Sequence, residues 1–373
     1  MTKRSGTPTV STPDSGAPAE PDGTDTIGDD GPPADAEPTG IEPTDDTDDT
    51  STDDADTDTG AGEVPPPLAP GAGAIALLAV VWLAAMLWAA QRSISFSEAQ
   101  SMAITTTAYA LPGVISASLV GGAAVSLAMA NLLSRRGVVR GTPRFAAAVA
   151  TGLATGLLAA LAVSLGYDAG SAVMLLAGTT AAAATVGGIA GGLRATPVIG
   201  ALVSAALTVF AVNFGFELFR DPLLSLYGAG DTASSQLTAL RRSAWTASVC
   251  NGLAAGAVAF GYLRLAARRG AARGYPGSAP RWTAYLVAGA GPGLLLLVAE
   301  VITRTAGARV LTLAGGLSEA DEAAQSVLGG ARVDHALLVL FLGALTAIII
   351  LGRTMGPATD RSETTPEDET TAS

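Results

Sequence analysis

The chain has 373 residues, of which 49% are hydrophobic and only 14% are charged, and its formal net charge is −12. The acidic residues gather at the two ends, because residues 1–70 hold 18 of the 33 acids and residues 357–373 hold five. The segment between them has 10 acids and 18 arginines, a net charge of +8. A body of Ala, Gly, Leu and Val with long uncharged runs excludes an ordinary soluble domain and indicates an all-α polytopic membrane protein.

The N-terminal segment, residues 1–70, consists mainly of Asp, Thr, Pro, Ser and Gly. It has too few aromatic and branched aliphatic side chains to offset the entropy that is lost on ordering. We therefore predict a disordered acidic tail, and a second one at residues 357–373. Because about 70 polar residues precede the first apolar segment, that segment does not fit a cleavable signal peptide and is expected to remain as a membrane anchor.

Eight apolar segments follow, each near the roughly 20 residues that a helix needs to cross the bilayer core. The runs are continuously apolar and lack an alternation with a period of two, so we expect helices and not a membrane barrel. The predicted transmembrane domain, residues 71–356, therefore contains spans at 73–91, 108–132, 145–166, 170–193, 197–218, 245–263, 282–303 and 335–352.

The arginines predict how these spans are oriented. With the N-terminus in the cytoplasm, eleven arginines of the body lie in inner loops and seven on the outer side, as the positive-inside rule prefers. All ten acids of the body then lie outside or at outer helix ends. We expect a protein of the plasma (inner) membrane with both termini in the cytoplasm, and the use of Arg, Ala and Gly suggests a GC-rich bacterial genome.

The outer loops 219–244 and 304–334 are long, and we predict a short surface helix in each, at residues 235–240 and 319–327. Within the spans, glycines recur four residues apart, which lets helix backbones approach closely where lipid tails compete equally with apolar side chains. We predict packing inside the subunit at these pairs, with a contact between copies of the chain as the alternative. The pairs are Gly152 with Gly156, Gly187 with Gly191, Gly188 with Gly192, Gly252 with Gly256, and Gly289 with Gly293.

Polar residues inside spans are costly and are the first place to look for function. Asn213 and Glu217 lie one turn apart in the outer half of the fifth span, and Asn251 and Glu300 lie at similar depth in the sixth and seventh. If these helices adjoin, they form an outward-facing polar vestibule whose two carboxylates can take a cation or a proton. In the alternative, Glu217 and Glu300 lie near the interface and pair with nearby arginines. The candidate counter-charges are Arg220, Arg304 and His335.

Pro292 lies inside the seventh span, within the sequence Gly289-Ala-Gly-Pro-Gly293. A proline removes one helical hydrogen bond and clashes with the preceding turn, so we expect a kink there. The kink is a candidate hinge for gating, and its alternative role is to shape a packing surface.

Little in the sequence points to catalysis or to a cofactor. Cys250 and His335 are the single residues of their types, which excludes an intramolecular disulfide and a pair of histidines for zinc. Two motif matches are rejected on context: residues 45–49 fit a DDxxD pattern but lie in the acidic tail, and Tyr167-Asp168 with residues 228–231 fits the aspartyl-protease YD and GxGD pair but lies in loops. We expect no cofactor, no metal and no nucleic-acid partner, and we assign the Arg-rich inner loops to topology and to contact with anionic lipid.

Two functions compete on these observations. A transporter or channel is favoured by eight Gly-rich spans, a proline within one of them and the polar vestibule. A non-catalytic membrane module that anchors or regulates a partner protein, with or without formation of a homo-oligomer, is favoured by the long tail and outer loops. A membrane enzyme ranks third because it would have to rely on carboxylates alone. The acidic tail, about −16, is expected to lie in the same compartment as an inner face of about +11 and to compete there with anionic lipid.

Overall fold

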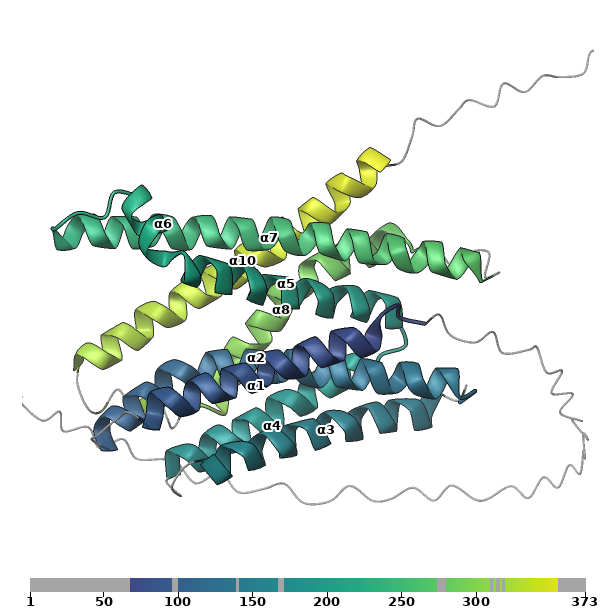
Figure 1. The fold of residues 1–373 in the computed structure, drawn as a ribbon, viewed down its shortest axis with the longest axis horizontal. Helices are drawn as coiled ribbons and strands as arrows, with labels where there is room; N and C mark the ends of the chain where they lie inside the picture. Colours follow the sequence, from purple (N-terminus) through teal and green to yellow (C-terminus); the bar gives the residue numbers. More distant parts are fainter. Residues whose placement is uncertain are drawn as a thin grey trace, which may run out of the picture. The chain divides into compact units, whose positions relative to one another are not determined.

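Figure 1 shows the fold in a computed structural model, which describes residues 68–95, 100–138, 141–166, 171–273, 280–308, 311–312, 316 and 319–354. The chain divides into two units, residues 1–59 and 60–373, and every described residue belongs to the second. The predicted acidic tails, 1–70 and 357–373, therefore lie outside the described residues except for 68–70, and their disorder stays a prediction.

The regular structure within the described ranges is α-helical, and eight helices are long and apolar enough to cross a membrane. The prediction of an all-α polytopic membrane protein with eight spans is thus confirmed. A short helix, α6 (Arg220–Leu226), follows the fifth span. The eight long helices are α1 (Ala72–Ser95), α2 (Gln100–Arg135), α3 (Gly141–Gly166), α4 (Ser171–Gly191), α5 (Thr196–Leu218), α7 (Ala233–Ala272), α8 (Trp282–Thr305) and α10 (Glu319–Thr354).

Helices α7 and α10 are much longer than their predicted spans. The two separate surface helices predicted at 235–240 and 319–327 are wrong, because both segments are the first turns of unbroken long helices. Thr232 caps α7 by accepting a hydrogen bond from the Ser235 amide, and the residues that follow are good helix formers, so nothing ends the helix before the span. With 40 residues, α7 is about 60 Å long, twice the bilayer core, and its ends must project from it.

Helices α1 to α4 form one group, here called bundle one, in which α2 packs against each of the other three (Figure 1). Glycines bring the backbones into contact: a Cβ atom at Gly152 would lie 2.5 Å from the Gly188 Cα, and one at Gly156 would lie 2.7 Å from the Ala181 carbonyl oxygen. At Gly187 a Cβ atom would overlap the carbonyl oxygen of Leu119. Bundle one is therefore held by direct contact between helix backbones.

Helices α5, α7, α8 and α10 form the second group, bundle two, in which α10 packs along both α7 and α8. Gly289 and Gly343 face each other so closely that a Cβ on either would overlap the other's carbonyl oxygen. Gly252 and Gly256 lie against α10 as well, with the Leu342 and Thr346 Cβ atoms 2.6 Å from the positions where their own Cβ atoms would be. All the glycines that the sequence singled out thus lie against other helices of the same chain; the remaining ones are Gly191, Gly192 and Gly293.

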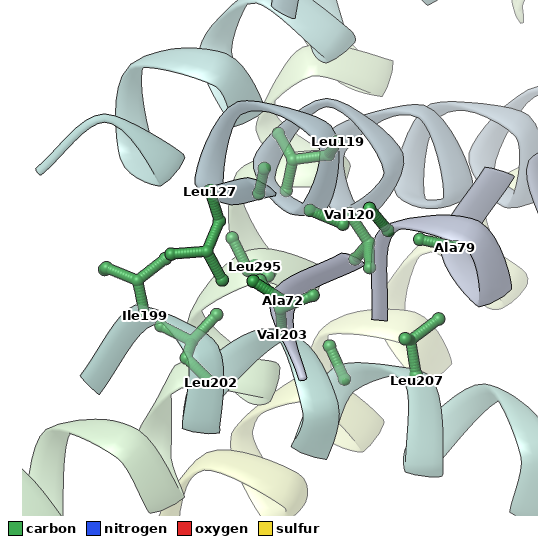
Figure 2. Packing of buried hydrophobic residues seen from close by; sticks show 14 of the residues in the cluster. Ala72, Ala79, Leu119, Val120, Leu127, Ile199, Leu202, Val203, Leu207 and Leu295 are labelled. Atoms are coloured by element: carbon green, nitrogen blue, oxygen red, sulfur yellow. The ribbon is translucent and has the colours of Figure 1, made fainter. Parts of the chain in front are cut away.

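The two bundles meet at a cluster of buried apolar side chains that we call the inter-bundle seal. Figure 2 shows it at close range, with Leu127 of bundle one next to Ile199 of bundle two. Its buried members are Ala69, Ala72, Ala76, Ala79, Leu119, Val120, Ala123, Ala124, Leu127, Ile199, Leu202, Val203, Ala206, Leu207, Phe210 and Leu295. Most of these belong to the first half of α1, the second half of α2 and the first two-thirds of α5, so the seal lies toward the predicted inner side.

Two hydrogen bonds hold the chain that enters α1 against both bundles. The Ala69 amide donates to Asn131 Oδ1 of bundle one at 3.2 Å, and Tyr262 of bundle two donates its hydroxyl proton to the Pro70 carbonyl oxygen at 2.7 Å. The residues just before the first span therefore tie the bundles together next to the seal.

Candidate functional site

A cavity of about 1080 Å³ lies between the bundles on the predicted outer side of the seal. Bundle one supplies one wall through Trp82 and Met86 of α1 and residues 112, 113 and 116 of α2. Bundle two supplies the rest through α5, α7, α8 and α10. Cavities of this kind, with mostly apolar walls and a few polar groups, are where membrane and soluble proteins commonly bind small molecules.

The structure brings the four predicted vestibule residues to this place. Asn213, Glu217 and Glu300 line the cavity, and Asn251 lies fully buried behind Asn213. Asn251 donates its side-chain amide to Asn213 Oδ1 at 2.6 Å, which links α7 to α5, while its own Oδ1 has no hydrogen-bond partner among the described residues. The helices that carry these four residues do lie next to one another, as expected. A functional role for the four residues stays a prediction.

Glu300 is the centre of the charged part of the cavity. Its side chain is only 6% exposed, and its two oxygens accept hydrogen bonds from the Nε atoms of Arg304 and Arg332, both at 2.8 Å. Arg304 lies one turn along α8, whereas Arg332 comes from α10. We call these three residues the Glu300 cluster. With two guanidinium groups on one carboxylate, it carries one excess positive charge.

Glu217 has a different environment. It forms an ion pair with Arg220 at 3.1 Å, in which the two side chains are 70% and 54% exposed. Both vestibule carboxylates are therefore paired with arginine, as in the alternative that the sequence left open. Among the counter-charges considered from the sequence, Arg220 and Arg304 take these positions, while His335 does not contact either acid through any described interaction.

His335 lines the cavity and is bound instead to Ser248 of α7, whose Oγ lies 2.7 Å from the histidine Nδ1. The Ser248 hydroxyl also donates to the Ala244 carbonyl oxygen at 2.8 Å. The tautomer of the imidazole ring decides which of the two groups donates in the bond between Nδ1 and the Ser248 hydroxyl. The single histidine of the chain thus fixes α10 against α7 at the cavity wall.

Three charged cavity residues were missed by sequence reasoning as site residues: Arg241, Arg332 and Asp334. Each was assigned to a long outer loop. These residues lie at the site because α7 and α10 continue without a break through the segments that were predicted as loops. The long helices place these segments along the cavity wall.

Pro292 is buried inside α8, which continues through it. It lines a small void of about 10 Å³ that Ser116, Phe210 and Leu296 of the outer cavity also border. Val120 and Leu295 of the seal border the same void. Pro292 therefore lies where the cavity ends and the seal begins, near the middle of α8.

The arrangement provides binding groups and not a recognisable catalytic set. Among the described residues, no group of three or more His, Cys, Asp or Glu is placed to hold a metal ion. No protein-family model matches the chain, and no curated protein or solved structure is significantly similar to it. A proposal for function therefore rests on the cavity and on the two bundles that enclose it.

Proposed function

We propose that the protein is a transporter in which the two bundles move against each other to expose the cavity to one side of the membrane and then to the other. The observation that carries this proposal is the position of the cavity, which lies between two internally tight bundles and ends at an apolar seal toward the predicted inner side. Alternating access of this kind is largely a rigid-body movement of one group of helices against another around a fixed site.

The different packing within and between the bundles supports such a movement. Inside each bundle, glycines place backbone against backbone, as at Gly187 with Leu119 and at Gly289 with Gly343. Between the bundles, the seal consists of Ala, Val, Leu, Ile and Phe side chains without a charged group among its buried members. Apolar side chains can separate and repack without breaking ion pairs, so the inter-bundle contact is the one suited to open.

The depth of the cavity also supports the proposal. Its base reaches Ser116 of α2 and borders the void at Pro292, and both residues lie near the middle of their helices. Transporters usually bind their substrates near this level of the bilayer. A solute that entered from the outer side would therefore stop directly above the seal.

Thiol accessibility in membrane vesicles tests the proposal, and the chain suits this method because Cys250 is its single cysteine. In a Cys250→Ala background, single cysteines replace Val203 of the seal, Ala331 of the cavity, and Ala259 of the bundle-two core as a control. Val203 and Ala259 are both fully buried. Each variant is treated with a membrane-impermeant maleimide in right-side-out and inside-out vesicles.

We expect Ala331→Cys to react from the outer side and Val203→Cys to react slowly from the inner side, while Ala259→Cys stays unlabelled. A Val203→Cys variant that reacts no faster than Ala259→Cys from either side would contradict alternating access. That result would favour the second interpretation of the sequence, a static module that anchors or regulates a partner. Labelling of Ala331→Cys from the inner side would instead reverse the predicted orientation.

A further inference from the structure

The Glu300 cluster has hydrogen-bond donors to spare. Arg304 and Arg332 each use Nε to bind the carboxylate, and neither guanidinium has another acceptor among the described residues. A guanidinium has five N–H donors, so the terminal Nη groups of both side chains remain available to a ligand. Buried Glu300 thus holds two cations in place without consuming their capacity to bind an anion.

The spare donors converge on one position. A Cβ atom built on Gly329 of α10 would lie 3.3 Å from Arg304 Nη2 and 3.7 Å from Arg332 Nη2, with Glu300 Oε1 at 3.6 Å. The two Nη2 groups therefore lie close to each other beside buried Gly329, and a side chain at this position would press against Arg304. Its neighbour Gly330 has nothing within 4 Å of the corresponding position.

The rest of the cavity is aromatic and aliphatic. Trp82 of bundle one stacks on Phe210 of bundle two with ring centroids 5.5 Å apart and meets Phe214 edge-on at 6.2 Å. Phe214, Trp245 and Phe341 also line the cavity and are 59%, 62% and 65% exposed. An apolar ligand body can cover these surfaces, which favours binding by about 25 cal/mol for each Å² removed from water.

We propose that the cavity binds an amphipathic anion, whose phosphate or carboxylate head is held by Arg304 and Arg332 while its apolar body lies against Trp82, Phe214 and Trp245. The inference that such an anion is the molecule carried across the membrane rests on the transport function proposed above. The inference that the cavity binds such an anion does not depend on transport and is tested by equilibrium binding.

The charges of the cavity favour an anion over the cation that the two carboxylates first suggested. A cation at Glu300 would have to displace one of two arginines from a buried carboxylate, and Glu217 is already paired with Arg220. Arg304 is not itself a lining residue, but it binds Glu300, which is one, and so adds its charge to the cluster. Arg241 and Asp334, which also line the cavity, are of opposite sign and leave the excess positive charge of the Glu300 cluster in place. Planar, two-pronged recognition of phosphate or carboxylate is also the chemistry for which arginine is best suited.

The test is a titration of the purified full-length protein in nanodiscs of a zwitterionic lipid, with quenching of tryptophan fluorescence as the signal. Trp82 and Trp245 line the cavity and report on a brominated chain that comes within contact distance. The probe is 12-bromododecyl phosphate, and its cationic counterpart is 12-bromododecyltrimethylammonium. Inorganic phosphate, added as a competitor, distinguishes a lipid-like ligand from a soluble anion.

The expected result is saturable quenching by the phosphate probe at concentrations where the ammonium probe gives none. Arg332→Gln and Arg304→Gln should each weaken binding by about tenfold or more, because each removes charge-assisted hydrogen bonds. Arg332→Lys keeps the positive charge but not the planar guanidinium with its paired donors, and should recover part of the affinity. Arg268→Gln serves as the control, since Arg268 is an exposed residue of α7 that does not line the cavity.

Two glycine variants give a sharper test that leaves every charge in place. Gly329→Ala puts a methyl group 3.3 Å from Arg304 Nη2, closer than an ordinary contact, and should weaken binding by displacing the arginines, whereas Gly330→Ala should not change it.

Equal affinity for the two probes, or unchanged affinity in both arginine variants, would overturn the anion site. Full competition by equimolar inorganic phosphate would overturn the inference that the ligand needs an apolar body. Binding without thiol exposure of the seal would refute transport alone, and exposure without binding would refute this inference alone.

Discussion

Bundle one and bundle two differ most where they face the cavity. Bundle one contributes only uncharged side chains to its lining, among them Trp82, Met86 and Ser116. Bundle two contributes all five charged lining residues that the structure describes, which are Glu217, Arg241, Glu300, Arg332 and Asp334, together with His335. The charged groups of the lining therefore come from bundle two, and bundle one faces them with uncharged side chains.

The bundles resemble each other in how they are built internally. In both, glycines bring helix backbones into direct contact at several points beside the clusters of buried side chains. The comparison teaches that close helix packing is shared between the bundles, while the charged groups of the cavity come from one of them. The predictions below test this division, beginning with the variants expected to do most damage.

The largest effect is expected from Gly187→Ala, because the new methyl group would overlap the Leu119 carbonyl oxygen of α2. Overpacking against a backbone costs about 3 kcal/mol or more, and we expect bundle one to lose its native packing. Gly178→Ala is the matched control in the same helix, since nothing lies within 4 Å of its Cβ position. Thermal unfolding in detergent should separate the two, and equal melting temperatures would contradict the backbone contact.

The corresponding pair in bundle two is Gly256→Ala and Gly261→Ala, both in α7. A methyl group at Gly256 would lie 2.5 Å from the Gly343 carbonyl oxygen, whereas Gly261 has open space. We expect a loss of about 1–3 kcal/mol for the first and little change for the second. If only one bundle proved sensitive to such substitutions, the picture of two equally rigid bodies would have to be abandoned.

The next effect distinguishes the two vestibule acids. Glu300→Gln leaves Arg304 and Arg332 without their shared carboxylate and should cost about 1–3 kcal/mol of stability together with loss of the probe-binding geometry. Glu217→Gln breaks an exposed pair and should cost less than about 1 kcal/mol. Unfolding temperatures and probe titrations of both variants check this order, and a larger effect at Glu217 would reverse the assignment of the site.

The sequence was sufficient for the spans and insufficient for the site. Eight helices follow from continuous apolar runs, because a bilayer requires about 20 such residues whatever the tertiary contacts. The pairing of Arg332 with Glu300 joins positions 32 residues apart and exists only because α10 begins at Glu319 and carries Arg332 past α8. The residues 319–334 lack a continuous apolar run, so the apolar pattern started the predicted span too late, at residue 335.

The four polar residues give the same lesson at shorter range. The sequence was enough to predict that three of them, Asn213, Asn251 and Glu300, lie at a similar depth in the membrane. Depth follows from counting residues along each helix. The sequence positions do not show which helix faces are turned toward each other. The hydrogen bond from Asn251 to Asn213 and the pairing of Glu300 with arginines both depend on this orientation. Helix rotation is set by the glycine contacts at Gly252 and Gly289, whose partners no single sequence reveals.

A smaller effect is expected at the tie between the bundles. Tyr262→Phe removes the hydrogen bond to the Pro70 carbonyl oxygen, worth about 1 kcal/mol, and should increase the labelling of Val203→Cys from the inner side by about fivefold. Tyr285→Phe is the control, since Tyr285 is buried within the core of bundle two. Equal labelling rates in the two variants would show that the tie does not restrain the seal.

The smallest expected effect concerns the N-terminal tail, whose charge of about −16 is predicted to share a compartment with the Arg-rich inner loops. Removing the tail should increase binding of the detergent-solubilised protein to anionic liposomes at low salt, with the difference lost at high salt as screening shortens the range of the interaction. The deletion should stop at residue 67, because Ala69 and Pro70 bind Asn131 and Tyr262, and a longer deletion would disturb the seal as well. Replacing the acids of residues 1–67 by Asn and Gln keeps the length and isolates the charge. Unchanged liposome binding in both variants would leave the tail as a solvated spacer.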